Sequence, residues 1–331
     1  MRPAAVGSSP PLLSTVNGIA TAHQPHLLDR ELVVVTGKGG VGKTTVAAAI
    51  ALLGAHAGRR TIVCEVSGQR RIPGLLGHPT AGGPGREEAV GADLWATTVD
   101  PEGALAEWAG QVVRPRAVVE LAVRSKAFSG FVAAAPGARE LVTITKAWEL
   151  GRADRWRPGT AGYDLVVLDA PASGHGLGLL RTPQTYAEIA RVGPIASQAR
   201  LVTGLLADPR RCGVVAVATA EETPVGETLE LQDALEQQFG RVPEAFIANG
   251  VLRDPLSSAD AAVVGAASDG THPAVIAALR ARRERSRTQA QQLRRLRRGA
   301  RAPVVTLPFL PGGAFDPGAI EALAGELRRR L

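Results

Sequence analysis

The sequence predicts an α/β fold, in which helices cover both faces of a doubly wound, mostly parallel sheet. Short apolar runs alternate with helical periodicity, beginning with residues 32–36 and 61–66 on either side of a helix that ends near residue 57. The run at 213–220 is apolar throughout, as in a parallel strand that is buried on both faces. A glycine-rich loop follows the first strand, at the end of the sheet where such folds bind ligands.

The glycine-rich loop matches the phosphate-binding pattern G-x-x-x-x-G-K-[ST]. Its nine residues are Gly37, Lys38, Gly39, Gly40, Val41, Gly42, Lys43, Thr44 and Thr45. Glycines allow the tight turn that points successive N–H groups at phosphate oxygens, and the following helix adds its positive end to the same site. The pattern therefore predicts a P-loop NTPase in which Lys43 reaches the β- and γ-phosphates and Thr44 offers a hydroxyl to Mg²⁺.

The loop carries a second lysine, Lys38, at a position where a plain phosphate loop needs no charge. The string Gly-Lys-Gly-Gly-Val-Gly-Lys-Thr-Thr resembles the deviant Walker A motif of the SIMIBI-type family that contains MinD, ParA, NifH and ArsA. The resemblance implies that ATP is the nucleotide and that two subunits enclose it. It also implies that Lys38 crosses the interface to the partner's phosphates and acts in catalysis with Lys43. A solvated lysine is the alternative.

An apolar strand ends in Asp169, as in a Walker B motif, whose carboxylate faces the Mg²⁺ shell. The following segment resembles the D-T-A-P-T-G-H second switch of the ArsA group, which includes the tail-anchored-protein-targeting ATPases. Asp169, Ser173, Gly174 and His175 match it, and residues 170–172 match in character. This separates the chain from ParA and MinD. The resemblance implies that His175 senses the γ-phosphate, and general-base catalysis is the alternative.

The first switch departs from the ArsA pattern. An alignment without gaps puts Ser67 where the family carries the aspartate that orients the attacking water, and serine cannot act as a carboxylate base. Glu65, on the same strand face, either substitutes for that carboxylate or is a structural hydrogen-bonding group. We therefore expect weak hydrolysis by this chain alone. We also expect a heterodimer with a paralogous ArsA-like ATPase chain that supplies the missing carboxylate, with a homodimer as the alternative.

The resemblance extends to the base of the nucleotide. The stretch around Glu227 and Thr228 resembles the P-E-x-x-x-V-x-E-T-x-R-L segment of the ArsA group. Asn249 ends a strand and, by resemblance, recognises adenine, which suits an amide that can both donate and accept. A turn residue before Gly250 is the alternative. The same resemblance implies that the loop at Pro308 flanks the adenine.

The domain organisation follows from periodicity. Residues 1–28 lack it and are expected to form a flexible N-terminal extension, whereas 29–331 form one ATPase domain. Residues 79–91 predict a loop, and 252–269 predict irregular structure. A helical insertion is expected at about 101–157, and its aromatic residues either pack against the sheet or furnish an apolar groove for a client. These residues are Trp108, Phe128, Phe131, Trp148 and Trp156.

Composition narrows the class of protein. No apolar run approaches the roughly 18 to 20 residues of a membrane span, and the N-terminus lacks a signal-peptide pattern, so a cytoplasmic protein is expected. Cys64 and Cys212 are the two cysteines, too few for a four-cysteine zinc site, and they are expected to be buried. The cysteines that arsenite-binding ArsA members and the iron–sulfur protein NifH carry are missing.

The formal net charge of +7 is concentrated late in the chain, where residues 280–301 contain ten arginines. We expect a solvated helix that covers the sheet. Contact with nucleic acid or an anionic membrane is the less favoured alternative, because no aromatic residue interleaves the arginines.

Together these features predict an ATP-binding dimeric molecular switch of the ArsA type. It would be an Mg²⁺-dependent ATPase whose nucleotide state changes the arrangement of its subunits and the binding of a client or partner protein. The alternative is an ATP-loaded, non-catalytic scaffold that docks on an anionic membrane or DNA through the arginine-rich helix.

Overall fold

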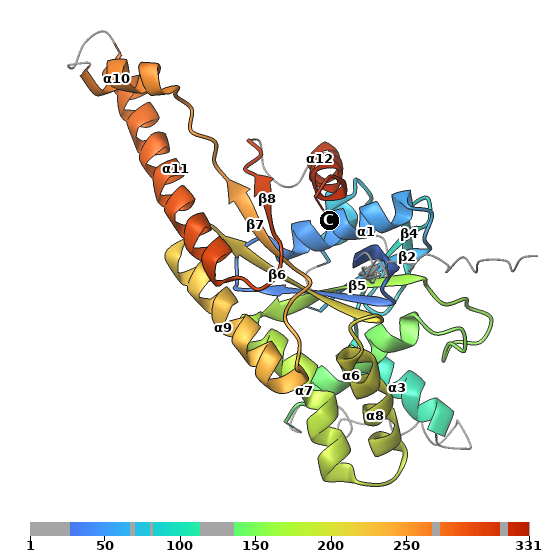
Figure 1. Cartoon of the computed structure of the whole chain (residues 1–331). Helices are drawn as coiled ribbons and strands as arrows, with labels where there is room; N and C mark the ends of the chain where they lie inside the picture. The colour runs from blue at the N-terminus through green and yellow to red at the C-terminus, as the bar shows by residue number, and fades with distance from the viewer. Residues whose placement is uncertain are drawn as a thin grey trace, which may run out of the picture.

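The computed structural model describes residues 27–66, 70–79, 82–112, 136–266, 272–311 and 317–330. Within these ranges, eight strands form one sheet in the order β3-β4-β2-β5-β1-β6-β7-β8. Neighbouring strands are parallel, except that β3 runs antiparallel to β4. Helices lie on both faces of the sheet (Figure 1). The predicted fold class, a doubly wound and mostly parallel α/β sheet, is confirmed.

The sheet holds the core of the protein. Its strands are β1 (Leu32–Gly37), β2 (Thr61–Glu65), β3 (Glu88–Gly91), β4 (Leu94–Thr98), β5 (Leu165–Ala172), β6 (Cys212–Thr219), β7 (Ala245–Val251) and β8 (Val304–Pro308). Successive side chains of a strand point to opposite faces. Val33 and Val35 of β1 accordingly pack in one apolar cluster, and Leu32 and Val34 in the other.

One face of the sheet is covered by α1 (Lys43–His56), α2 (Ile72–Leu75) and α12 (Pro317–Arg328). The 3₁₀ helix η1 (Leu27–Asp29) adds Leu27 and Leu28 to the same cluster. Helix α1 is rich in alanine, and most of its residues are buried because it lies between the sheet and α12. The phosphate-binding loop is therefore attached to a helix that is largely buried.

The other face is covered by α6 (Ala138–Leu150), α7 (Ser173–Ala190), α8 (Pro194–Ala207) and α9 (Glu222–Phe239). Helix α3 (Pro101–Val112) packs beside α6 (Figure 1). Helix α8 follows α7 after a break that includes Gly193, which has a φ of 92°, and it begins at Pro194, a residue that suits the first turn of a helix. None of the helices in the described part of the chain is both long enough and apolar enough to cross a membrane.

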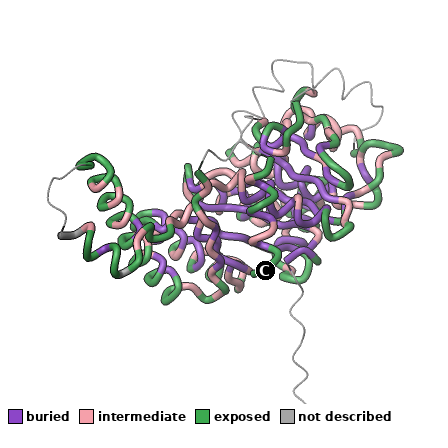
Figure 2. The backbone as a smooth tube through the Cα atoms, turned by 90° about the horizontal axis from the view of Figure 1, so that it is seen from above, coloured by how far each residue is buried: buried purple, intermediate pink, exposed green. Residues whose placement is uncertain are grey.

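Helices α10 (Ser258–Ala266) and α11 (Pro273–Gly299) form an arm that extends away from the sheet (Figure 1). The inner part of α11 is anchored by Leu293 and Leu296, which are buried in the core. The outer part of α11 and most of the described part of α10 are exposed (Figure 2). The arginine-rich segment is thus a helix, as predicted, and only its inner part covers the sheet.

Two local predictions are wrong. Helix α10 lies within 252–269, predicted as irregular, and it begins at a capping box in which Ser257 Oγ accepts from the Asp260 N–H and Asp260 Oδ2 accepts from the Ser257 N–H. Strand β3 lies within the predicted loop 79–91. It is short and at the edge of the sheet, where little apolar alternation is needed. Residues 1–26, 113–135 and 331 lie outside the described residues, with most of the predicted extension and part of the predicted insertion.

Candidate nucleotide-binding site

The glycine-rich loop lies at the carboxyl end of β1, between the ends of β5 and β6. Gly37, Gly40 and Gly42 have positive φ angles of 148°, 81° and 90°. A Cβ atom on Gly37 would lie 2.1 Å from the carbonyl oxygen of Val217, and one on Gly42 would lie 2.2 Å from Nδ2 of Asn249. Glycine is therefore required at these two positions by backbone conformation and by space. The side of the loop at Gly39 and Gly40 is open.

The two lysines of the loop have different partners. Lys43 Nζ donates to the carbonyl oxygen of Lys38 at 3.0 Å, so its ammonium bridges back across the loop. Burial lowers the pKa of Lys43, and the charge of Asp169 acts in the opposite direction. Lys38 Nζ lies 2.6 Å from Oε1 of Glu227, a residue of α9 in the same chain. Lys38 is thus ion-paired within its own chain, and its contact with a partner subunit stays a prediction.

Thr44 and Asp169 meet beside the loop. Thr44 Oγ1 donates to Oδ2 of Asp169 at 2.7 Å. Asp169 is buried, and its second oxygen, Oδ1, has no hydrogen-bond partner among the described residues. Burial raises the pKa of Asp169 to about 6, against the hydrogen bond from Thr44 and the charge of Lys43. A buried carboxylate oxygen without a donor, next to a hydroxyl, is a donor set that fits a hard divalent cation such as Mg²⁺.

Glu65 lies directly opposite Asp169 in the pairing of β2 with β5. Its two carboxylate oxygens accept hydrogen bonds from the N–H groups of Arg71 at 2.8 Å and Ile72 at 3.1 Å, at the start of α2. The side chain is buried, which raises its pKa, while the two backbone hydrogen bonds act in the opposite direction. Of the two alternatives for Glu65, the geometry supports the structural one. Ser67 lies outside the described residues.

Asn249 and Pro308 lie at the carboxyl ends of β7 and β8. Asn249 Nδ2 donates to the carbonyl oxygen of Val41 at 2.9 Å, so this amide contacts the phosphate-binding loop directly. Pro308 pairs with Val251 of β7 and is half-buried. The roles of Asn249 and Pro308 at an adenine stay predictions. The backbone of His175 lies in the first turn of α7, immediately after β5.

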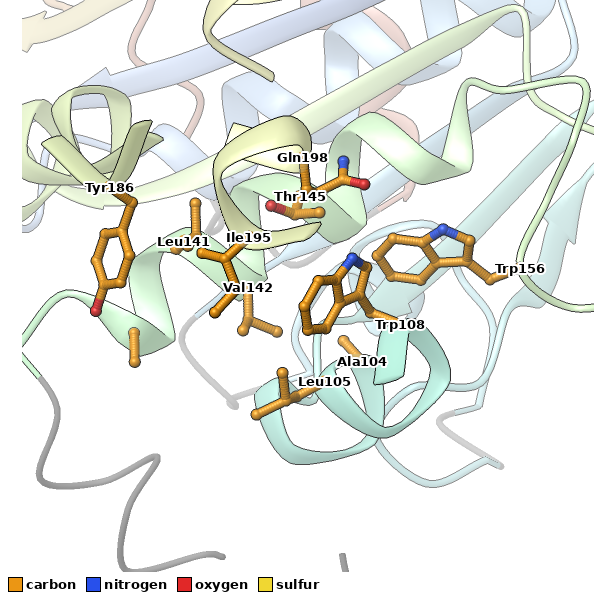
Figure 3. Close-up of a pocket in the computed structure, with 11 residues that line it drawn as sticks. Ala104, Leu105, Trp108, Leu141, Val142, Thr145, Trp156, Tyr186, Ile195 and Gln198 are labelled. Carbon is orange, nitrogen blue, oxygen red and sulfur yellow. The ribbon is translucent and has the colours of Figure 1, made fainter. Parts of the chain in front are cut away.

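An apolar pocket of about 130 Å³ lies between α3, α6, α7 and α8. Figure 3 shows the indole rings of Trp108 and Trp156 at one end of the pocket and the phenol ring of Tyr186 at the other. Trp148 is instead buried in the core, whereas Phe128 and Phe131 lie outside the described residues. The described aromatic residues of 101–157 thus divide between core packing and a pocket wall.

A network of ion pairs, which the sequence did not predict, joins α6 to the residues before β3. Arg155 Nε lies 2.7 Å from Oε1 of Glu149, and its Nη2 lies 2.6 Å from Oε1 of Glu87. Lys146 Nζ lies 2.5 Å from Oε2 of Glu107 and 2.9 Å from Oε2 of Glu149. The pairs with Glu87 and Glu107 join separate segments, which no local sequence pattern marks, whereas Lys146 and Glu149 are three residues apart in α6. The pairing of Lys38 with Glu227 was missed for the same reason.

The parallel sheet, the phosphate-binding loop and the Thr44–Asp169 pair define a P-loop NTPase. A family model described as anion-transporting ATPase matches residues 30–199, about half of the chain. The chain belongs to this anion-transporting, ArsA-type ATPase family, as the resemblance of its loop and second switch implies.

Curated relatives agree with this assignment. The chain is 32% identical over 219 residues to a Mycobacterium tuberculosis protein named ATPase BagA, with 62% of this chain and 60% of that protein matched. It is 25% identical over 252 residues to the Escherichia coli arsenical pump-driving ATPase, with 68% of this chain and 41% of that protein matched. The matched part therefore spans less than two thirds of the length of each of these relatives.

Proposed function

We propose that this chain binds ATP with Mg²⁺ and works as a dimeric molecular switch that hydrolyses ATP weakly on its own. The observation that carries this proposal is the pair of Thr44 and Asp169 beside Lys43, at a loop in which Gly37 and Gly42 cannot be replaced without collision. Backbone N–H groups of the loop would bind the phosphates, and Lys43 would exchange the Lys38 carbonyl for the β- and γ-phosphates. Thr44 and Asp169 would hold Mg²⁺, which neutralises phosphate charge when bound.

Weak hydrolysis is proposed from the state of Glu65 and from the identity of residue 67. Glu65 is engaged by two backbone N–H groups, and Ser67 stands where the family has an aspartate. We propose that a paralogous ArsA-like ATPase chain supplies the missing carboxylate in a heterodimer, in which Lys38 contacts the partner's nucleotide. Arsenite transport is not part of the proposal, because Cys64 and Cys212 are both buried free thiols whose pKa values burial raises.

Phosphate release from ATP tests this function. The chain is assayed alone and with the product of a neighbouring paralogous coding sequence, with Mg²⁺ and with chelator. We expect slow turnover alone, a rise of tenfold or more with the paralogue, and loss of both with Asp169→Asn in this chain. Fast turnover by the chain alone would remove the reason for a heterodimer. Failure to bind ATP in the presence of Mg²⁺ would overturn the proposed function.

The apolar pocket supplies a surface through which the switch could act on a partner. Tyr186, which lines it, belongs to α7, and α7 begins directly after β5 at the second switch. We propose that this pocket binds an apolar segment of a client polypeptide. Fluorescence of Trp108 and Trp156 should shift when an apolar peptide is added with ATP, and Trp108→Gln should abolish the shift. A shift that Trp108→Gln leaves unchanged would place the client elsewhere.

A second candidate function is an ATP-loaded scaffold that docks on a polyanion through α11. Arg280, Arg287, Arg294 and Arg298 recur at spacings of seven, seven and four residues and are exposed. At 3.6 residues per turn they form one row, here called the arginine row, on the side of α11 opposite the buried Leu293 and Leu296. Among the described residues, Arg287, Arg294 and Arg298 make no ion pair.

The scaffold predicts salt-sensitive binding to duplex DNA or to vesicles of anionic lipid. Changing all four residues of the arginine row to glutamine should abolish this binding. The matched control changes four arginines that are paired with carboxylates on the surface: Arg211, Arg301, Arg329 and Arg330. Equal losses in the two variants would show a general charge effect and remove the support for a docking helix.

A further inference from the structure

Two consecutive arginines at the start of α2 have different surroundings. Arg70 has a φ of 41°, and its Nη2 lies 2.5 Å from Oε1 of Glu88, so its charge is directed toward the edge of the sheet. Arg71 is exposed, and its guanidinium makes no hydrogen bond or ion pair with any described residue. Of these two neighbours, Arg71 is therefore the one whose charge is available to a ligand.

The backbone of Arg71 is fixed beside the candidate Mg²⁺ site. Its N–H donates to Glu65 Oε1, and Glu65 is the cross-strand neighbour of Asp169, which accepts the hydrogen bond from Thr44. The backbone of Arg71 is thus connected to the Thr44 hydroxyl through Glu65 and Asp169, by two hydrogen bonds and one strand pairing. The positive charge of Arg71 acts on both Glu65 and Asp169, lowering their pKa values against the larger effect of burial.

The two lysines of the loop already have partners, so a further cation could contact the phosphates from outside the loop. Lys43 is directed at the loop, and Lys38 is held by Glu227. An arginine presents a planar fork of N–H donors that matches two phosphate oxygens at once. P-loop NTPases that use an arginine to stabilise charge at the transferred phosphate receive it from the same chain or from a partner.

We propose that Arg71 binds the γ-phosphate of ATP in its own subunit, and that Glu65 is the positioning residue that holds it there. The inference rests on the proposed binding of ATP at this loop, which it deepens by naming a phosphate contact outside the loop. A guanidinium strengthens binding of the γ-phosphate but accepts no proton, so Arg71 would not replace the carboxylate that orients the attacking water.

The test compares the affinities of the full-length chain for a non-hydrolysable ATP analogue and for ADP, measured by calorimetry with Mg²⁺. In Arg71→Gln the ratio of ATP-analogue to ADP affinity should fall about tenfold to a hundredfold, because the γ-phosphate loses a charge-assisted contact. Arg71→Lys should recover part of the ratio, since one ammonium can replace one arm of the fork. Arg70→Gln, the matched control, removes the same charge one residue away and should change the ratio less than about twofold.

Glu65→Gln tests the positioning. In a chain that keeps Arg71, Glu65→Gln should lower the ratio of ATP-analogue to ADP affinity. In a chain that already carries Arg71→Gln, adding Glu65→Gln should have little further effect, as expected of two residues that act together. Equal loss of both affinities in Arg71→Gln, or the same loss in Arg70→Gln, would overturn the proposal. If the wild-type chain binds neither nucleotide, the proposed function fails instead, and the two failures are therefore distinct.

Discussion

Lys38 Nζ lies 2.6 Å from Glu227 Oε1, so the lysine proposed to reach a partner's nucleotide is held by a helix of its own chain. Each side chain is about one third exposed, at 35% and 32%, so the pair should contribute no more than about 1 kcal/mol. Glu227→Gln should therefore release Lys38 and strengthen ATP-dependent dimerisation with the paralogous chain by up to about fivefold.

Sedimentation velocity at several protein concentrations checks this expectation, with Lys38→Ala as the variant that should lose the dimer. A Glu227→Gln variant that dimerises less well than the wild type would mean that Glu227 helps the dimer form.

A matched pair of glycine substitutions tests the geometry of the loop. Gly42→Ala places a methyl group against the Asn249 amide at a φ of 90°, so it should destabilise the fold by about 1 to 3 kcal/mol and abolish ATP binding. Gly39→Ala meets nothing within 4 Å and should be tolerated in the absence of nucleotide. Thermal unfolding with and without ATP separates these effects. Equal stability of the two variants would contradict the strain at Gly42.

The contact of Asn249 with the loop and its predicted recognition of adenine can be tested separately by comparing nucleotides. Asn249→Ala removes the hydrogen bond to the Val41 carbonyl, which should weaken binding of any nucleoside triphosphate by about tenfold or less. If Asn249 also recognises adenine, the loss should be larger for ATP than for GTP. Titrations with both nucleotides measure the difference, and equal losses would restrict Asn249 to bracing the loop.

The buried ion pairs around Arg155 should make the fold sensitive to loss of one partner. Arg155→Leu leaves the fully buried Glu149 without one of its partners and should cost about 3 to 5 kcal/mol of unfolding free energy. Arg157→Leu breaks the exposed pair with Glu107 and should cost less than about 1 kcal/mol. Urea unfolding followed by circular dichroism measures both. Similar values would show that burial does not decide the strength of these pairs.

The same network predicts a dependence of stability on pH. Burial alone would raise the pKa of Glu87, but the hydrogen bond and charge of Arg155 outweigh it and hold that pKa below 4.5. The folded state then binds fewer protons than the unfolded state, so this contribution is complete above pH 4.5 and is lost as the pH falls below it. Arg155→Leu should flatten the acid limb of the stability curve. An unchanged slope would mean that other carboxyl groups control acid unfolding.

The sequence was sufficient for the features that local pattern determines. Apolar periodicity predicted the central strands, and the motif predicted the loop that ends at Lys43 and the carboxylate Asp169, because each depends on residues close together in the chain. The contact between Lys38 and Glu227 joins residues 189 positions apart, and no periodicity encodes it. Glu65 was left with two interpretations until its partners, Arg71 and Ile72, were placed in space.

The arginine row on α11 also limits how copies of this chain can assemble, because two such rows repel each other. Two such helices brought face to face would place two rows of positive charge within the screening distance of about 8 Å at physiological ionic strength. The arm is anchored to the body by Leu293 and Leu296, so the row cannot be turned aside without unpacking the core. Self-association along this face is therefore opposed by the sequence itself, whereas a different chain with acidic residues at the corresponding place would meet no such barrier.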